Sequence, residues 1–195
     1  MLRFLLIFSL ALSLFACGVT PKTHLYVLNS EQGFPSQENG LAVGVWKVKL
    51  PELLDRSEIV TRSGQYEIEL ADFHHWAGRL GPNIDALIAQ ELSKHLDTVN
   101  VRTSPWNSQK INDYQVKTFI ERFDGKLGGE AVVSGSWVLL NGKGSKQLTR
   151  QSFSLKAPLT SDKYSDLVAV LSKLTSQLSQ LIAEEIERVS QQNNK

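Results

Sequence analysis

Residues 130–142 read Glu-Ala-Val-Val-Ser-Gly-Ser-Trp-Val-Leu-Leu-Asn-Gly, and this stretch decides the fold. The apolar residues predict one long strand over residues 130–140. The Asn141-Gly142 pair that follows is typical of a hairpin turn between antiparallel strands. Residues 146–155, in which polar residues alternate before Phe153 and Leu155, are the predicted return arm of this hairpin.

Upstream of this hairpin, other segments carry the alternation of a strand. In residues 113–123, Tyr114, Val116 and Ile120 share one predicted face, while Phe119 and Phe123 lie on the other. Ser63-Gly64 predicts a tight turn between two further strands. The two strands that flank Ser63-Gly64 are residues 58–62 and 65–70. The other predicted strands are residues 24–28, 41–48 and 98–103.

Two segments have the periodicity of amphipathic helices. Residues 82–96 begin with a proline suited to a first helical turn and carry one apolar stripe. Residues 161–191 repeat leucine at intervals of four and three, which predicts a helix about 40 Å long. We expect this helix to pack across the sheet, although its far end also has the pattern of a helix that pairs with another subunit. The predicted fold class is α+β: a mostly antiparallel sheet with a mid-chain helix and a long C-terminal helix packed on it.

The N-terminus has the pattern of a bacterial lipoprotein signal. One positive charge, Arg3, precedes an apolar run from Phe4 to Ala16, which is about the length of a secretory signal and too short to span a bilayer comfortably. The run ends in Leu-Phe-Ala-Cys at residues 14–17, and Cys17 is the only cysteine of the chain. We therefore expect cleavage before Cys17 and its modification by diacylglyceryl and N-acyl chains, including palmitate. The alternative is an uncleaved anchor helix with an incidental cysteine.

The composition of the mature chain limits its possible functions and the sources of its stability. The 21 basic residues include Arg3, so cleavage leaves 20 basic against 20 acidic residues, and no excess of positive charge indicates nucleic-acid binding. A disulfide within one chain is excluded by the single cysteine. The hydrophobic core must therefore supply the stability, and 42% apolar residues suit a globular domain.

We find no motif for catalysis, a cofactor or a metal. The Gly-x-Ser-x-Gly elbow and the His-Glu-x-x-His pattern are absent, and the adjacent pair His74-His75 would point to opposite faces of a strand. The glycine-rich stretches at 125–129 and 142–146 lie next to predicted strands and are interpreted as loops. Among the four tryptophans, Trp106 lies between Pro105 and Asn107 in a predicted loop, so it is the candidate partner contact.

Several segments together resemble the PqiC (YmbA) family of auxiliary lipoproteins of ABC-type intermembrane transport, over nearly all of residues 24–189. The resemblance lies in the order and spacing of these segments. The segments are Leu-Pro-Glu-Leu-Leu-Asp-Arg at 50–56, Ile-Val-Thr-Arg at 59–62, Glu-Leu-Ala-Asp-Phe-His-His-Trp at 69–76, Val-Lys-Thr-Phe-Ile-Glu-Arg-Phe-Asp-Gly at 116–125 and Leu-Ile-Ala at 181–183.

The resemblance implies an outer-membrane lipoprotein that faces the periplasm and works with an MCE-domain tunnel protein in intermembrane lipid transport, in support of membrane integrity. It implies no enzymatic activity and allows a homo-oligomer, since some members form rings. Gly18 follows Cys17, so the aspartate that retains lipoproteins in the inner membrane is missing. The resemblance carries over no catalytic residue. Arg62, Arg122 and Asp124 are expected to form ion pairs beside the sheet. Asp55 and Arg56 are expected to cap and pair near the turn that Pro51 starts.

The predicted organisation is a signal peptide over residues 1–16, the lipidated Cys17 with a short tether to residue 23, the transport auxiliary domain over residues 24–190 and a polar tail over 191–195. The leading hypothesis is an accessory subunit of envelope lipid traffic. One alternative is a structural or assembly lipoprotein that binds an outer-membrane β-barrel or a secretin. The other is a lipid-binding carrier with an internal cavity.

Overall fold

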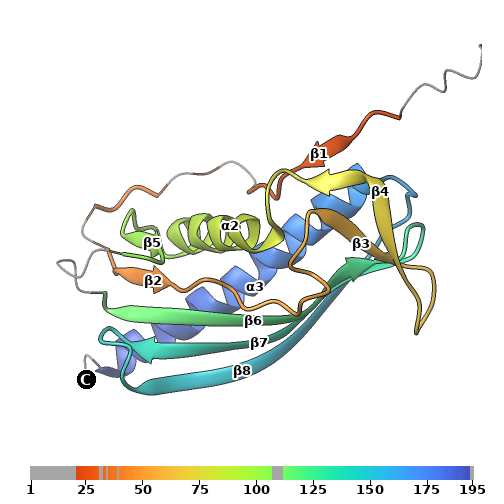
Figure 1. Ribbon diagram of the computed structural model, residues 1–195. Helices are drawn as coiled ribbons and strands as arrows, with labels where there is room; N and C mark the ends of the chain where they lie inside the picture. The colour runs from red at the N-terminus through yellow and green to blue at the C-terminus, as the bar shows by residue number, and fades with distance from the viewer. Residues whose placement is uncertain (1–20, 31–32, 34, 39, 107–111, 194–195) are drawn as a thin grey trace, which may run out of the picture.

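The structure is a computed structural model of the chain, and it describes residues 21–30, 33, 35–38, 40–106 and 112–193. The predicted signal peptide and Cys17 lie outside the described residues. Eight strands and two helices make up the described part (Figure 1). They are β1 His24–Tyr26, β2 Val43–Val45, β3 Glu58–Arg62, β4 Ile68–Trp76, α2 Leu80–His95, β5 Val101–Thr103, β6 Tyr114–Gly125, β7 Glu130–Asn141, β8 Gln147–Pro158 and α3 Tyr164–Asn193.

Strand β6 is the centre of one mixed sheet. One edge of β6 pairs with β7, which pairs in turn with β8. The other edge of β6 pairs with β2 near its start and with β3 at its end. Strand β5 extends the sheet beyond β2, and β4 and β1 extend it beyond β3. The sheet therefore splits into two short arms on one side of β6 and a long hairpin on the other.

The expectation of a mostly antiparallel sheet is wrong. Among the described residues, four of the seven strand pairings are parallel. The antiparallel pairings join strands that follow one another in the chain, where a hairpin sets the direction. The parallel pairings bring together segments such as Val43–Val45 and Tyr114–Gly125, which lie far apart in the sequence. Local alternation predicts that a strand forms but does not say which distant strand it pairs with.

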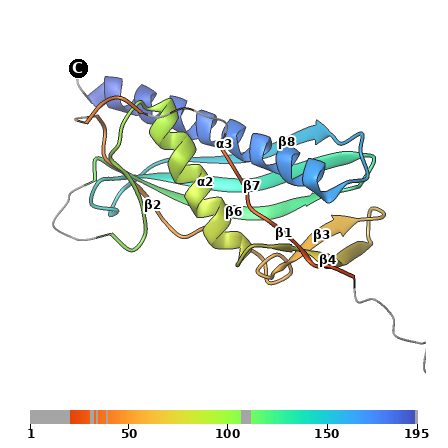
Figure 2. The same cartoon turned by 90° about the horizontal axis from the view of Figure 1, so that it is seen from above.

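Both predicted helices are confirmed, and both pack on the same face of the sheet (Figure 2). Helix α2 begins at Leu80, two residues before the predicted start, and ends at His95. Helix α3 covers Tyr164–Asn193, a length of about 45 Å, and runs across β6, β7 and β8. Leucine and isoleucine stripes of both helices meet the inner face of the sheet, where Trp137 and Phe123 are almost completely buried.

Phe123 lies on the opposite face from the one predicted. The pairing of β6 with β7 shifts between Ile120 and Arg122, so Glu121 is an extra residue, or bulge, in β6. One extra residue reverses the alternation of side chains. Phe123 therefore joins Ile120 in the core with 2% of its surface exposed, whereas Phe119 stays on the outer face.

The hairpin between β3 and β4 is confirmed, but its predicted tight turn is wrong. Arg62 pairs with Ile68, so five residues separate the two strands instead of the two residues Ser63-Gly64. The second arm also continues to Trp76, well beyond the predicted end at Leu70. A helical turn follows Pro51, since the amides of Leu54 and Asp55 both donate to the Pro51 carbonyl oxygen.

Candidate functional site

The sequence analysis named two candidate functional residues, Cys17 and Trp106, and the structure describes only Trp106. Cys17 lies outside the described residues. Trp106 is half-buried because its ring packs edge-on against Trp46, with 5.1 Å between the ring centroids. Trp46 is the more exposed of the two, and its Nε1–H donates to Gln115 Oε1 at 2.8 Å. A role for Trp106 in partner contact stays a prediction. Because the two rings are in contact, a partner that binds Trp106 would also contact Trp46.

The predicted ion pairs around Asp124 are confirmed. Asp124 has 1% of its surface exposed and accepts hydrogen bonds from Arg62 Nε at 3.1 Å and from Arg122 Nη2 at 2.7 Å. The hydrogen bond to Asp124 raises the pKa of Arg122. This group lies where β3 meets the end of β6, at the pairing of Thr61 with Gly125. Its position indicates that it joins β3 to the end of β6 rather than binding a ligand.

Asp55 forms an ion pair near the turn after Pro51, as expected, and its partner is Arg79. The Asp55 carboxylate accepts a hydrogen bond from Arg79 Nη2 at 3.2 Å. Arg79 immediately precedes α2, so this exposed ion pair joins the turn after Pro51 to the start of the helix. The pair forms one end of an open cleft, which is the candidate functional site.

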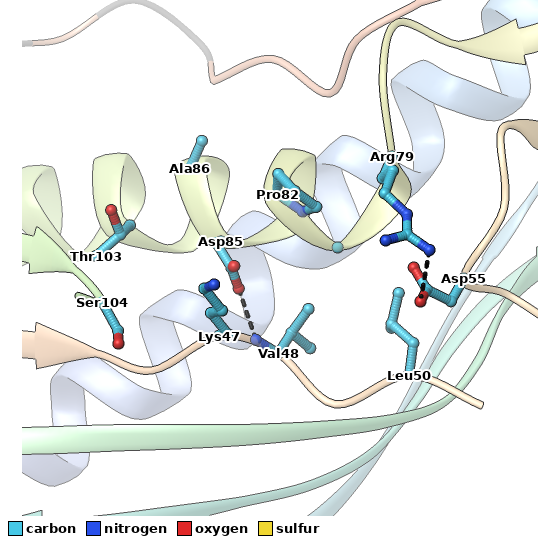
Figure 3. Close-up of a pocket in the computed structure, with 11 residues that line it drawn as sticks. Lys47, Val48, Leu50, Asp55, Arg79, Pro82, Asp85, Ala86, Thr103 and Ser104 are labelled. Atoms are coloured by element: carbon cyan, nitrogen blue, oxygen red, sulfur yellow. Dashed lines mark hydrogen bonds and ion pairs between the residues drawn. The ribbon is translucent and has the colours of Figure 1, made fainter. Parts of the chain in front are cut away.

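This cleft, which we call the α2 cleft, lies between the start of α2, the chain after β2 and the end of β5 (Figure 3). Its volume is about 380 Å³. Both apolar and polar side chains line it, so it suits an amphipathic group. The lining residues are Lys47, Val48, Leu50, Asp55, Arg79, Gly81, Pro82, Asp85, Ala86, Thr103 and Ser104.

Asp85 is the distinctive group of the α2 cleft. It projects from α2 toward the chain after β2, and its Oδ1 accepts the Val48 amide hydrogen at 2.7 Å (Figure 3). Burial raises the pKa of Asp85 to about 6, against an ordinary value of 3.8, although the Val48 hydrogen bond and the Lys47 charge act in the opposite direction. In the part of the chain that the structure describes, the Val48 amide is its one hydrogen-bond donor. The carboxylate therefore has acceptor capacity left for a group that enters the cleft.

The pKa of Asp85 predicts a pH dependence of stability. The folded chain holds the Asp85 proton up to about pH 6, whereas an unfolded carboxyl group releases it near 3.8. Between these values the folded state binds more protons, so the Asp85 contribution to stability falls as the pH rises. We expect Asp85→Asn to unfold at higher urea concentration than the wild type at pH 8. The difference should vanish toward pH 4, where Asp85 is itself neutral; an offset independent of pH would contradict the assignment.

A second groove, of about 740 Å³, lies between α3 and residues 27–30. Glu91 of α2 lies at this groove with none of its surface exposed and accepts hydrogen bonds from Ser30 and from Ser176 of α3. One carboxylate thus joins α2, α3 and the N-terminal segment. The sequence analysis missed Glu91, but its place among the apolar residues of the α2 stripe, between Ile88 and Leu92, was a usable signal.

Each of the two clefts contains one carboxylate of α2. Asp85 and Glu91 lie on separate sides of α2, and each accepts hydrogen bonds from one or two donors. Asp55 is a second carboxylate of the α2 cleft. Within the described residues, no group of three or more His, Cys, Asp or Glu side chains is placed to hold a metal ion. Asp85 can accept a hydrogen bond from a hydroxyl, ammonium or guanidinium group, and such a bond is strengthened when the donor is charged.

Comparison with known proteins identifies the family of the chain. The family model of ABC-type transport auxiliary lipoprotein components matches residues 26–183. The intermembrane transport lipoprotein PqiC of Escherichia coli (strain K12) is 30% identical over 163 residues, which are 84% of this chain and 83% of that protein. The chain therefore belongs to the PqiC family of transport auxiliary lipoproteins. This family is described as a transport component and not as an enzyme family.

Solved structures share the fold. A protein from Xanthomonas campestris superposes with a TM-score of 0.71 at 15% identity and covers 88% of this chain and 99% of its own. An uncharacterised protein superposes with a TM-score of 0.68 at 24% identity and covers 85% of this chain and 99% of its own. Helices long and apolar enough to cross a membrane are absent from the described residues.

Proposed function

We propose that the protein is a non-enzymatic docking subunit of an intermembrane lipid transport system. Acyl chains on Cys17 would hold it at the periplasmic face of the outer membrane, where it contacts an MCE-domain tunnel protein of the inner-membrane system. Membership of the PqiC family supports the transport role, and the Leu-Phe-Ala-Cys sequence supports the anchor. Buried apolar side chains of the sheet and of both helices form one continuous cluster, which favours docking over the carrier hypothesis.

The observation that carries the docking role is Asp85 in the α2 cleft. A desolvated carboxylate with a single donor costs free energy in the isolated chain, and a positively charged partner group recovers it. The Trp46–Trp106 pair lies close by in the chain, since Trp106 follows Ser104 of the cleft by two residues. Tryptophan is among the residues that contribute most to binding at protein interfaces. We propose that the partner inserts a lysine or arginine beside Asp85 and contacts the tryptophans.

Two further features of the proposed function concern assembly. A homo-oligomeric ring would place several copies of the α2 cleft around one axis, and such a ring would fit the end of a tunnel. The formally neutral charge of the mature chain would not prevent copies from approaching one another. If the protein supports lipid transport in this way, its loss would make lipid delivery at the outer membrane inefficient. The envelope would be weakened as a result.

The charge of Asp85 provides the test of docking. We expect Asp85→Lys to reduce recovery of the MCE-domain partner at least tenfold after cross-linking in cells and affinity purification, because two positive charges would then meet in the cleft. Glu187→Lys, which makes the same charge change on the exposed side of α3, should leave recovery unchanged. Equal recovery with both variants would contradict docking through the cleft. Recovery of an outer-membrane β-barrel or secretin alone would favour the assembly lipoprotein.

A further inference from the structure

The parallel ribbon of β1 and β4 has one face that packs inward and one that is exposed. His24, Leu25 and Tyr26 pair with His74, His75 and Trp76 in that order. Trp76 is buried in the core, so the residues on its side of the ribbon face the protein. On the opposite face of the ribbon, Leu25 is 66% exposed and Phe73 37%. Further exposed apolar side chains nearby are Leu70 of β4, at 42%, and Val27, which follows β1 and lines the groove beside α3.

Contacts on the inner side fix the orientation of this ribbon. The His74 ring stacks on His24 at 5.1 Å and on Tyr164, the first residue of α3, at 4.1 Å. The Tyr26 hydroxyl and His74 Nδ1 form a hydrogen bond of 2.8 Å. The ribbon is thereby held against the start of α3, and it cannot turn its apolar side inward without breaking this stack.

The position of the ribbon in the chain indicates what covers its outer face. Six residues separate Cys17 from His24, so the two Cα atoms are at most roughly 25 Å apart. The loop between β3 and β4 lies at the same end of the molecule as β1, away from the C-terminus (Figures 1 and 2). This loop carries Tyr66, which is 92% exposed. Aromatic and aliphatic side chains on one membrane-proximal end are typical of contact with a lipid surface.

We infer that the outer face of the β1–β4 ribbon, formed by Leu25 and Phe73, inserts into the interfacial layer of the membrane that holds Cys17. This inference rests on the proposed anchor and adds a second membrane contact to it. The contact fixes the orientation of the domain, so that the end with β2 and β5 points away from the bilayer (Figure 1). An acyl chain on a tether would by itself leave the domain free to rotate.

The test measures lipid contact at one labelled side chain in the full-length, lipidated protein. Phe73→Cys is labelled with the fluorophore NBD and reconstituted in vesicles of phosphatidylethanolamine and phosphatidylglycerol that contain doxyl-labelled lipid. Leu181→Cys, at an exposed apolar residue of α3, is the matched control. We expect the doxyl lipid to quench NBD at residue 73 at least threefold more than at residue 181.

Each other outcome contradicts a separate part of the inference. Equal quenching at the two residues would overturn the lipid contact and leave the anchor intact. Protection of residue 73 from both doxyl lipid and aqueous iodide would show that a second copy covers the ribbon instead. Labelling of the unsubstituted chain would show a free Cys17 thiol, which overturns the anchor and with it the basis of the lipid contact.

Discussion

Replacement of Cys17 by alanine is expected to move the protein from the membrane fraction almost completely to the soluble periplasmic fraction. The chain has no other thiol that can take a diacylglyceryl group, and helices able to span a membrane are absent from its described part. Each methylene of an acyl chain contributes about 0.8 kcal/mol to membrane binding, so loss of three chains cannot be replaced by the ribbon alone. Fractionation of cells and metabolic labelling with radioactive palmitate measure the effect.

Gly18→Asp is the matched control for this substitution. It leaves Cys17 in place, so labelling with palmitate should continue, while the protein should move to the inner membrane because aspartate after the lipidated cysteine is a retention signal. Palmitate label that persists in Cys17→Ala would overturn the lipidation site. Palmitate label that is lost in both variants would instead show that residue 18 affects processing before sorting.

The second large effect is expected at Gly135, which lies opposite the bulge in β6. Gly135 pairs with Ile120 where the register shifts, and a Cβ atom built on it would overlap the backbone carbonyl oxygen of Phe119. Because the obstacle is backbone, β6 and β7 must move apart where they form the centre of the sheet. We expect Gly135→Ala to lower the free energy of unfolding by about 3 kcal/mol, measured by urea denaturation.

Gly64→Ala provides the comparison, since no atom lies within 4 Å of a Cβ at this loop residue. An alanine there removes conformational freedom from the unfolded chain and should change stability by less than about 1 kcal/mol. Similar unfolding free energies for the two variants would show that the strands at the bulge adjust without cost. The near-ultraviolet circular dichroism of Gly135→Ala should also change if Phe123 and Trp137 lose their packing.

The elements that the sequence predicted correctly are those with local signals. The stripes of α2 and α3 and the turn at Asn141-Gly142 depend on residues a few positions apart, and each was found within three residues of its predicted bounds. Phe123 was assigned to the wrong face because the prediction assumed unbroken alternation. The bulge that reverses the alternation is a property of two strands and not of one.

The candidate site was predictable only in part. The ion pairs of Asp124 followed from charged residues in the family motifs, and they are present. Asp85 had no signal in the sequence, because its donor, Val48, is 37 positions away and its burial depends on how α2 packs. Glu91 could have been noticed, since a carboxylate on an apolar stripe needs a polar partner in the folded chain.

The sequence by itself determined the family, the predicted lipid anchor, both helices and the central hairpin. These features depend on residue types that lie close together in the sequence. Their local preferences do not require contacts between distant parts of the chain. Only the tertiary structure decided that β1, β2, β3 and β5 join the sheet by parallel pairing, that the β1–β4 ribbon exposes apolar side chains near the tether, and that Asp85 lies in a cleft. The reason is that strand pairing, burial and the pKa of a carboxyl group depend on residues that are distant in the chain. Only the folded structure brings these residues together.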